Sequence, residues 1–156
     1  MYSMSVDELQ NIGISRMNRT EIADFLQSQK VGVLALPAER APYVVPLAFG
    51  YDGESMLYFT FVLGTDSRKE QLSEQADLAR VLVFNVDSMF HWESVQLTGT
   101  IDAVPDEAWD ISDLDDVWRP EIFDRASLSG GTSVFQFQIQ DQSGIKHTGM
   151  PPGFER

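Results

Sequence analysis

The sequence predicts a mainly β (α+β) domain, a six-stranded antiparallel β-barrel with short flanking helices. Six short runs rich in Val, Leu, Ile, Tyr and Phe recur along the chain, and Pro, Gly or Asp residues bound most of them. The first three runs follow one another at the short spacing that antiparallel hairpins allow. Neither an internal repeat nor an interdomain linker divides the 156 residues, so we expect a single domain over residues 1–156.

The composition favours a packed core and limits the partners that the domain can bind. Hydrophobic residues make up 43% of the chain, and 24 acidic residues oppose 11 basic ones, which gives a net charge of -13. Binding of nucleic acid or of an anionic membrane is therefore disfavoured. Adaptation to high intracellular salt explains such an acidic surface, and an ordinary acidic protein is the alternative.

Several kinds of site find no support in the sequence. The chain has no Cys, which excludes disulfides, thiolate nucleophiles and zinc–thiolate sites. His91 and His147 lie far apart, so no compact metal-ligand pattern occurs. No apolar run approaches the ~20 residues that a membrane span needs, and the N-terminus lacks the features of a signal peptide. We therefore expect a cytoplasmic protein without a metal site.

The first predicted element is a short amphipathic helix over Arg19–Ser28. Asn18 and Glu21 have the spacing of a capping box, in which each residue satisfies a backbone N–H group of the other. Met17 and Ile22 have the spacing of a hydrophobic staple at the same helix end. We expect the helix to cover one mouth of the barrel.

Three strands are predicted in close succession after this helix, over residues 31–37, Tyr43–Tyr51 and Met56–Val62. Asp52-Gly53 marks a two-residue turn between the second strand and the third, because Gly tolerates the positive φ that such a hairpin requires.

Three further strands are predicted over residues 79–86, 92–104 and 133–140. The first of these is apolar enough to be buried on both faces, whereas the other two alternate between apolar and polar side chains. Gly99 within the fifth strand indicates a bulge or the close approach of another backbone or ligand. The lead-in of residues 1–16 and the tail of residues 144–156 are expected to be irregular.

Two more segments are predicted to be helical, residues 67–75 and residues 105–125. In the first segment, Leu72 would face inward. The second segment is strongly acidic, and its apolar side chains would pack on the barrel beneath a hydrated outer face.

The most informative polar cluster is Ser67-Arg68-Lys69, which follows the third strand. Two adjacent cations in the first turn of a helix oppose the helix dipole, and this placement suggests that an anion binds there. A phosphate would accept hydrogen bonds from the N–H groups of the helix start and from these side chains. The alternative is a pair of solvent-facing cations that pair with Asp66 or Glu70.

Taken in order, these segments resemble the pyridoxamine 5'-phosphate oxidase-like family of FMN-binding split barrels. The resemblance extends over residues 18–140 and rests on the series VGVLAL, YVVPLAF, LYFTF, SRKEQL, ARVLVF and WESVQLTG. Small flavoproteins of this family, similar to nitroimidazole reductases, match better than the oxidases of vitamin B6 metabolism. Glu93 stands where those oxidases have an Arg, and the C-terminal segment lacks their basic substrate-binding residues.

The resemblance implies a homodimer with two FMN molecules in clefts at the subunit interface. The phosphate of FMN would be held by Ser67, Arg68 and Lys69, whose fork, point charge and hydroxyl suit a phosphate. The isoalloxazine ring would lie along the second and third strands, against mainly backbone groups of Val45, Pro46, Leu47, Phe59 and Thr60. The other subunit would contribute Trp92, Ser94 and Gln96. Core packing is the alternative role for the apolar members, and core or interface packing is the alternative for Trp92.

The resemblance also implies an FMN-dependent oxidoreductase that acts on a small-molecule redox substrate of unknown identity. Its catalytic residues are not defined, although Tyr58, His91 and His147 are candidate acids or bases. His147 would lie in a mobile tail that closes over the flavin, or it would be a surface histidine. Two alternatives stay open: a non-catalytic flavin-binding or storage protein, and a barrel that binds a deazaflavin or haem in the same cleft.

Overall fold

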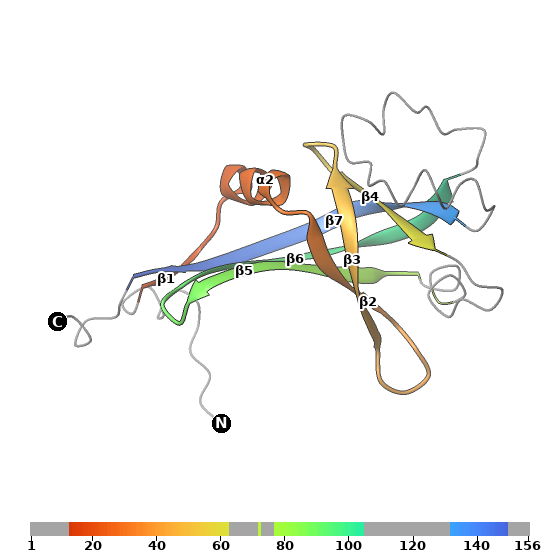
Figure 1. The fold of residues 1–156 in the computed structure, drawn as a ribbon, viewed down its shortest axis with the longest axis horizontal. Helices are drawn as coiled ribbons and strands as arrows, with labels where there is room; N and C mark the ends of the chain where they lie inside the picture. The colour runs from red at the N-terminus through yellow and green to blue at the C-terminus, as the bar shows by residue number, and fades with distance from the viewer. Residues whose placement is uncertain (1–12, 63–71, 73–76, 105–131, 150–156) are drawn as a thin grey trace.

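The computed structural model describes residues 13–62, 72, 77–104 and 132–149, and within them one helix and seven strands form (Figure 1). The elements in chain order are β1 (Ile14–Arg16), α2 (Arg19–Ser28), β2 (Val31–Leu36), β3 (Tyr43–Tyr51), β4 (Met56–Val62), β5 (Ala79–Ser88), β6 (His91–Val104) and β7 (Thr132–Thr148). The predicted helix and the second and third predicted strands have the expected bounds. The segments predicted to be helical over residues 67–75 and 105–125 lie outside the described residues, apart from Leu72.

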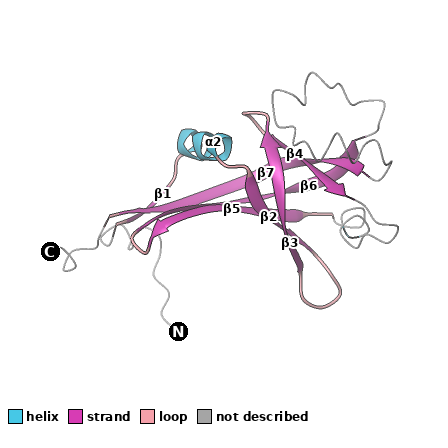
Figure 2. Ribbon diagram, in the orientation of Figure 1, coloured by secondary structure: helices cyan, strands magenta, loops and turns pink. Residues whose placement is uncertain are grey.

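The strands form one antiparallel sheet in the order β1-β7-β4-β3-β2-β5-β6, and a further pairing of β6 with β7 closes it (Figure 2). Strands β2 to β7 therefore make a closed six-stranded barrel, to which β1 adds one more strand along β7. This arrangement confirms the predicted fold class. Among the described residues, no helix is long and apolar enough to cross a membrane.

The core fills the inside of the barrel with the inward side chains of alternate strand positions. The largest fully buried side chains are Phe49, Phe59, Phe135 and Phe137, and the Phe59 and Phe135 rings stack with centroids 6.1 Å apart. Leu72 is partly buried against this core, as its predicted inward position requires.

Helix α2 begins with the predicted capping box. The Glu21 N–H donates to Asn18 Oδ1 at 2.8 Å, and the Asn18 N–H donates to Glu21 Oε1 at 3.1 Å. Met17 and Ile22 are both buried in the core cluster, as expected for a staple. The Glu21 carboxylate also accepts a hydrogen bond from Lys146 Nζ, so this helix end is tied to β7.

Strand β7 is much longer than the sequence predicts, because it continues to Thr148 instead of ending at residue 140. Its pairing with β6 extends from Val134 opposite Val104 to Thr148 opposite His91. The prediction of an irregular tail from residue 144 is therefore wrong for its first five residues. Pairing with β6 along the segment, and with β1 over Ile145–His147, outweighs the low strand propensity of these polar residues.

The prediction of an irregular lead-in is also wrong at its end, because Ile14–Arg16 forms β1 and pairs with β7.

Gly144 allows β7 to pass close to the start of helix α2. A Cβ atom at Gly144 would lie 2.9 Å from Met17 Sδ and 3.1 Å from Ile22 Cγ1, so the start of the helix packs directly on the backbone of β7.

The turn between β3 and β4 lies where the sequence places it but has four residues, not two. Gly53 has the expected positive φ, at 91°. Asp52 explains the longer loop, since its Oδ1 accepts hydrogen bonds from the backbone N–H groups of Glu54, Ser55 and Met56 at 2.8, 3.0 and 3.0 Å. The Asp52 side chain thus accepts hydrogen bonds from backbone N–H groups of the loop. In a two-residue turn, such groups would bond within the β-ladder instead.

Gly99 lies at a shift of register between β6 and β7, which confirms the predicted bulge. A Cβ atom there would lie 2.0 Å from the carbonyl oxygen of Gln138 and 3.0 Å from the Phe137 ring. The barrel can therefore close at this point only if residue 99 has no side chain.

We predict that Gly99→Ala destabilises the protein by about 3 kcal/mol or more, because a backbone carbonyl cannot move aside as a side chain can. Denaturant unfolding would measure the loss. Thr98→Ala is the matched control on the neighbouring residue, with an expected change below about 1 kcal/mol. Equal effects of the two substitutions would contradict the close approach.

Candidate functional site

The barrel is open along part of one seam, between β3 and β4. The described pairings of these two strands run only from Tyr51 opposite Leu57 to Phe49 opposite Phe59. Beyond that point β3 pairs only with β2, and β4 pairs only with β7. Figure 1 shows the two strands diverging from their common turn. This divergence leaves strand edges that can contact another molecule. The pairing of β2 with β5 is also short and covers Val33–Ala35.

The hydrogen-bond pattern identifies the backbone groups that face this seam. The Phe49 N–H donates to Lys30 O at 2.9 Å, so Phe49 and every second residue before it point their backbone groups toward β2. The alternate residues Val44, Pro46 and Ala48 therefore face the open seam. Pro46 fits this position because it has no N–H group to contribute to a ladder.

The same reasoning applies to β4 on the other side of the seam. The Ile139 N–H donates to Ser55 O at 2.8 Å, so Ser55, Leu57 and Phe59 direct their backbone groups toward β7. The backbone groups of Thr60 then face the open seam. Between them, β3 and β4 offer it several carbonyl oxygens and N–H groups.

The structure therefore divides the five positions that the sequence predicts along these strands. Pro46 and Thr60 have backbone groups at the open seam. Val45, Leu47 and Phe59 are partly or fully buried in the core, and their backbone groups belong to ladders. Cofactor contacts from all five stay a prediction. Val44 and Ala48, which the sequence analysis does not name, also have backbone groups at the seam. Strand periodicity predicts which side chains point inward. It does not predict which of the two neighbouring strands the backbone groups of a given residue bond to.

The predicted residues of β6 lie together on the outer surface of the barrel. Val95 and Leu97 are fully buried, so the alternate residues Trp92, Ser94 and Gln96 point outward. Trp92 and Ser94 are partly buried, whereas Gln96 is exposed. Their partners in β5 are Val86, Phe84 and Leu82, which point to the same side.

Within one chain the two groups of predicted residues are well separated. Pro46 pairs with Val33, Val33 pairs with Leu82, and Leu82 pairs with Gln96. Three steps between neighbouring strands correspond to about 14 Å along the sheet. The structure therefore does not bring the β6 residues to the seam of their own chain.

The surface between the two groups is apolar and exposed. We call it the outer apolar face, and it comprises Val44 on β3, Val31 on β2, and Phe84 and Val86 on β5. These side chains are 59%, 57%, 49% and 61% exposed, respectively. Large contiguous apolar surfaces are rare on soluble monomers and mark interaction sites.

The predicted phosphate-binding residues Ser67, Arg68 and Lys69 lie outside the described residues. The candidate acids and bases are described. Tyr58 is partly buried in β4, and His91 is exposed, with its Nε2 atom 3.7 Å from Asp87 Oδ2. His147 is neither in a mobile tail nor at the surface: it lies within β7 and is only 4% exposed. The extension of β7 accounts for this correction.

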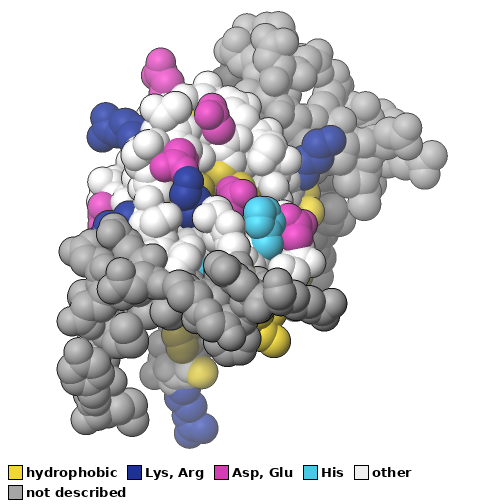
Figure 3. All heavy atoms as spheres, turned by 90° about the vertical axis from the view of Figure 1, so that its left-hand side faces the viewer, with side chains coloured by type: hydrophobic (Ala, Val, Ile, Leu, Met, Phe, Trp, Pro, Cys, Tyr) yellow, Lys and Arg dark blue, Asp and Glu magenta, His cyan; other side chains and the backbone are white. Residues whose placement is uncertain are grey.

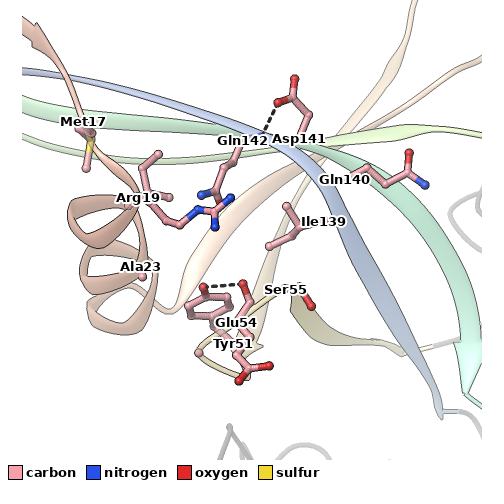
Figure 4. Close-up of a pocket in the computed structure, with 12 residues that line it drawn as sticks. Met17, Arg19, Ala23, Tyr51, Glu54, Ser55, Ile139, Gln140, Asp141 and Gln142 are labelled. Atoms are coloured by element: carbon pink, nitrogen blue, oxygen red, sulfur yellow. Dashed lines mark hydrogen bonds between the residues drawn. The ribbon is translucent and has the colours of Figure 1, made fainter.

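A cleft of about 660 Å³ lies between α2, the β3–β4 turn and β7 (Figure 4). The Arg19 side chain points into it, toward Gln142 and Ile139, while the carboxylate of Asp141 points away. Tyr51 forms part of the wall, and its hydroxyl donates to Glu54 O at 3.1 Å. The described lining residues of this cleft include none of the predicted cofactor contacts.

A second cleft, of about 510 Å³, lies on the other side of α2 against β5, β6 and β7. It is lined by acidic side chains, among them Asp24 and Glu93, and by the Glu21–Lys146 ion pair. Figure 3 shows the corresponding end of the molecule, where an exposed imidazole lies among acidic side chains. Among the described residues, neither cleft offers the adjacent cations that a phosphate group would need.

The barrel with one open seam defines the class of this protein as a split barrel. A sequence profile of the family described as pyridoxamine 5'-phosphate oxidase matches residues 18–146. The chain therefore belongs to the pyridoxamine 5'-phosphate oxidase-like split-barrel family, as the sequence predicts. No curated protein is similar enough in sequence to count as a relative.

Solved structures share the fold at low sequence identity. An FAD-binding protein from Mesorhizobium loti has a TM-score of 0.72 at 21% identity, covering 88% of this chain and 99% of that one. An FAD and heme binding protein from Mycobacterium smegmatis has a TM-score of 0.68 at 20% identity, covering 89% and 75%. A proposed 5-nitroimidazole antibiotic resistance protein from Bacteroides thetaiotaomicron has a TM-score of 0.63 at 17% identity, covering 86% and 89%.

We predict a pH-dependent contribution of Tyr51 to stability. Burial raises the pKa of the Tyr51 phenol above its ordinary value of 10.0, and the neighbouring carboxylates of Asp52 and Glu54 raise it further. The folded state therefore holds this proton more tightly than the unfolded state does. The resulting stabilisation is complete below about pH 10 and is lost as the pH rises through the folded-state pKa.

Comparison with Tyr51→Phe isolates this effect from the titration of other tyrosines. Below pH 10 the variant is expected to be less stable by about 1 kcal/mol, through loss of the hydrogen bond to Glu54 O. The difference in unfolding free energy between the two proteins should shrink above pH 10. A difference that grows with pH would contradict the raised pKa.

Proposed function

We propose that this protein binds FMN at the open seam between β3 and β4 and that it acts as an FMN-dependent oxidoreductase in a homodimer. The observation that carries the proposal is the seam itself. It offers backbone carbonyl oxygens and N–H groups of Val44, Ala48 and Thr60, which suit the polar edge of an isoalloxazine ring. Family membership and the flavin-binding neighbours support the same cofactor class.

The outer apolar face supports the homodimer. A ring at the seam lies about 14 Å along the sheet from Gln96 of the same chain, beyond hydrogen-bond reach. A two-fold symmetric pairing of outer apolar faces would bury the exposed side chains of both copies. It would also bring Ser94 and Trp92 of one copy toward the seam of the other, which would complete the site.

The cations Arg68 and Lys69 are the proposed phosphate ligands. They follow Val62, at the open end of the seam, by only six and seven residues in the sequence. Their charge-assisted hydrogen bonds contribute about 1.5–3 kcal/mol each. This is enough to hold a phosphate despite the net charge of -13, because distant charges are screened by salt.

The bound flavin would supply the redox chemistry, that is, transfer of a hydride or of electrons. The residues of this chain would position the ring and exclude water from it. We propose no catalytic acid or base. Tyr58 lies on β4 at the seam, opposite Gly50, whereas His91 is at the start of β6 and His147 is enclosed in β7.

Purification and spectroscopy test the proposal directly. The visible spectrum and the mass of the small molecule that co-purifies distinguish FMN from FAD, deazaflavin and haem. Haem is a specific alternative, because one structural neighbour binds both FAD and heme. A flavin that NADH or NADPH reduces and that an acceptor reoxidises would support an oxidoreductase. Bound flavin without any turnover would favour a storage protein.

We predict that Arg68→Ala with Lys69→Ala weakens FMN binding about 100-fold or more, because two charge-assisted interactions are lost. Titration of the apoprotein with FMN would measure the change. Arg19→Ala with Lys30→Ala is the matched control: both side chains are exposed at the two ends of α2, and the change in net charge is the same. Equal losses in the two double variants would indicate a long-range charge effect and not a phosphate site.

We predict that Val31→Glu converts the dimer to a monomer and releases the flavin, because it places a charge at the centre of the outer apolar face. Sedimentation velocity combined with flavin absorbance would measure both effects. Gln27→Glu adds the same charge on the exposed side of α2 and should leave the dimer intact. A wild-type protein that is monomeric while saturated with FMN would contradict the shared site.

A further inference from the structure

We infer that His147 is a positioning residue for the flavin site and that it acts through Trp92. The inference rests on the proposed function and assigns a role to a buried histidine that is otherwise unexplained. His147 and Trp92 are direct partners in the β6–β7 ladder, so their side chains leave the sheet on the same side. That side is the outer surface, where Ser94 also points.

The two rings are stacked. The imidazole and indole centroids are 5.9 Å apart, with an interplanar angle of 20°. Such aromatic pairs hold each other in a preferred orientation. Because His147 is only 4% exposed whereas Trp92 is partly exposed, the buried imidazole is the fixed member and the indole rests on it.

Two further neighbours hold the imidazole in place. The Phe90 ring contacts it from the β5–β6 turn, with centroids 5.6 Å apart and an interplanar angle of 47°. Gly13 covers it from the start of β1. A Cβ atom on Gly13 would lie 3.2 Å from His147 Nε2 and 3.0 Å from Gly149 O, and Gly13 has a φ of 90°. Only glycine fits this position without displacing the imidazole.

Strand β1 therefore completes the support of the Trp92 ring, although it lies outside the six-stranded barrel and pairs with β7. The Thr148 N–H donates to Gly13 O at 3.3 Å, and Ile14 pairs with His147. In the proposed dimer the indole faces the flavin of the other copy. Its orientation would then set how tightly that flavin is held and how polar its surroundings are.

Substitution of His147 by Leu and by Phe separates ring stacking from simple space filling. His147→Leu fills a similar volume without a ring, and we expect flavin binding to weaken roughly three- to tenfold. His147→Phe keeps an aromatic plane and should restore wild-type affinity. The visible absorption band of the bound flavin should shift in His147→Leu as it does in Trp92→Ala, and not in His147→Phe.

A double-mutant cycle tests whether the effect passes through Trp92. In the Trp92→Ala background, His147→Leu should cause no further loss of flavin affinity. Gly13→Ala, which would displace the imidazole of His147, should cause the same loss of flavin affinity. Its control is Gly53→Ala, which has an equally positive φ in the β3–β4 turn but meets only the end of the Gln27 side chain.

The outcomes separate this inference from the function on which it rests. Wild-type protein that binds no flavin would overturn the proposed function, and the inference with it. Flavin binding by the wild type with unchanged affinity in His147→Leu would overturn the inference alone. A loss of the same size with and without Trp92 would do the same, since His147 would then act on folding and not on the indole.

Discussion

The barrel depends on the ladder between β6 and β7, because this pairing joins the two ends of the sheet. On one side, β7 pairs with β6 along the whole length of β6. On its other side, β7 pairs first with β4 and then with β1. A strand with so many pairings can tolerate residues of low strand propensity. The bulge at Gly99 lets it change direction between these partners, and Gly144 lets α2 pack on its backbone.

Whereas the β6–β7 ladder closes the barrel, the seam between β3 and β4 leaves it partly open. Each strand is paired on its other side, β3 with β2 and β4 with β7, so the barrel holds together although the seam between β3 and β4 is incomplete. The seam presents backbone groups, and such groups can bind a ligand largely irrespective of the side chains. Pro46 fits this unpaired strand edge, because the nitrogen of a proline within a strand cannot donate a hydrogen bond to a neighbouring strand.

The sequence predicted the fold class and the local features, but not which residues pair across distant strands. Asn18 and Glu21 define the helix start within four residues, and the apolar runs of β3 and β4 define those strands. By contrast, the sequence predicts that the sixth strand ends at residue 140, and only pairing with distant strands extends β7 beyond it. The same limit explains why the sequence does not show which of residues 44–48 direct their backbone groups to the seam. The choice between odd and even residues depends on the register of β2 against β3.

The pairing of β1 with β7 joins one of the first described segments to the last one. During synthesis, β4 and β6 therefore leave the ribosome before the strand that both of them require. Their unpaired edges can bind other chains until Thr148 has emerged, which favours aggregation of stalled or truncated products. Closure of the barrel therefore waits for β7, the last strand of the described residues, to emerge.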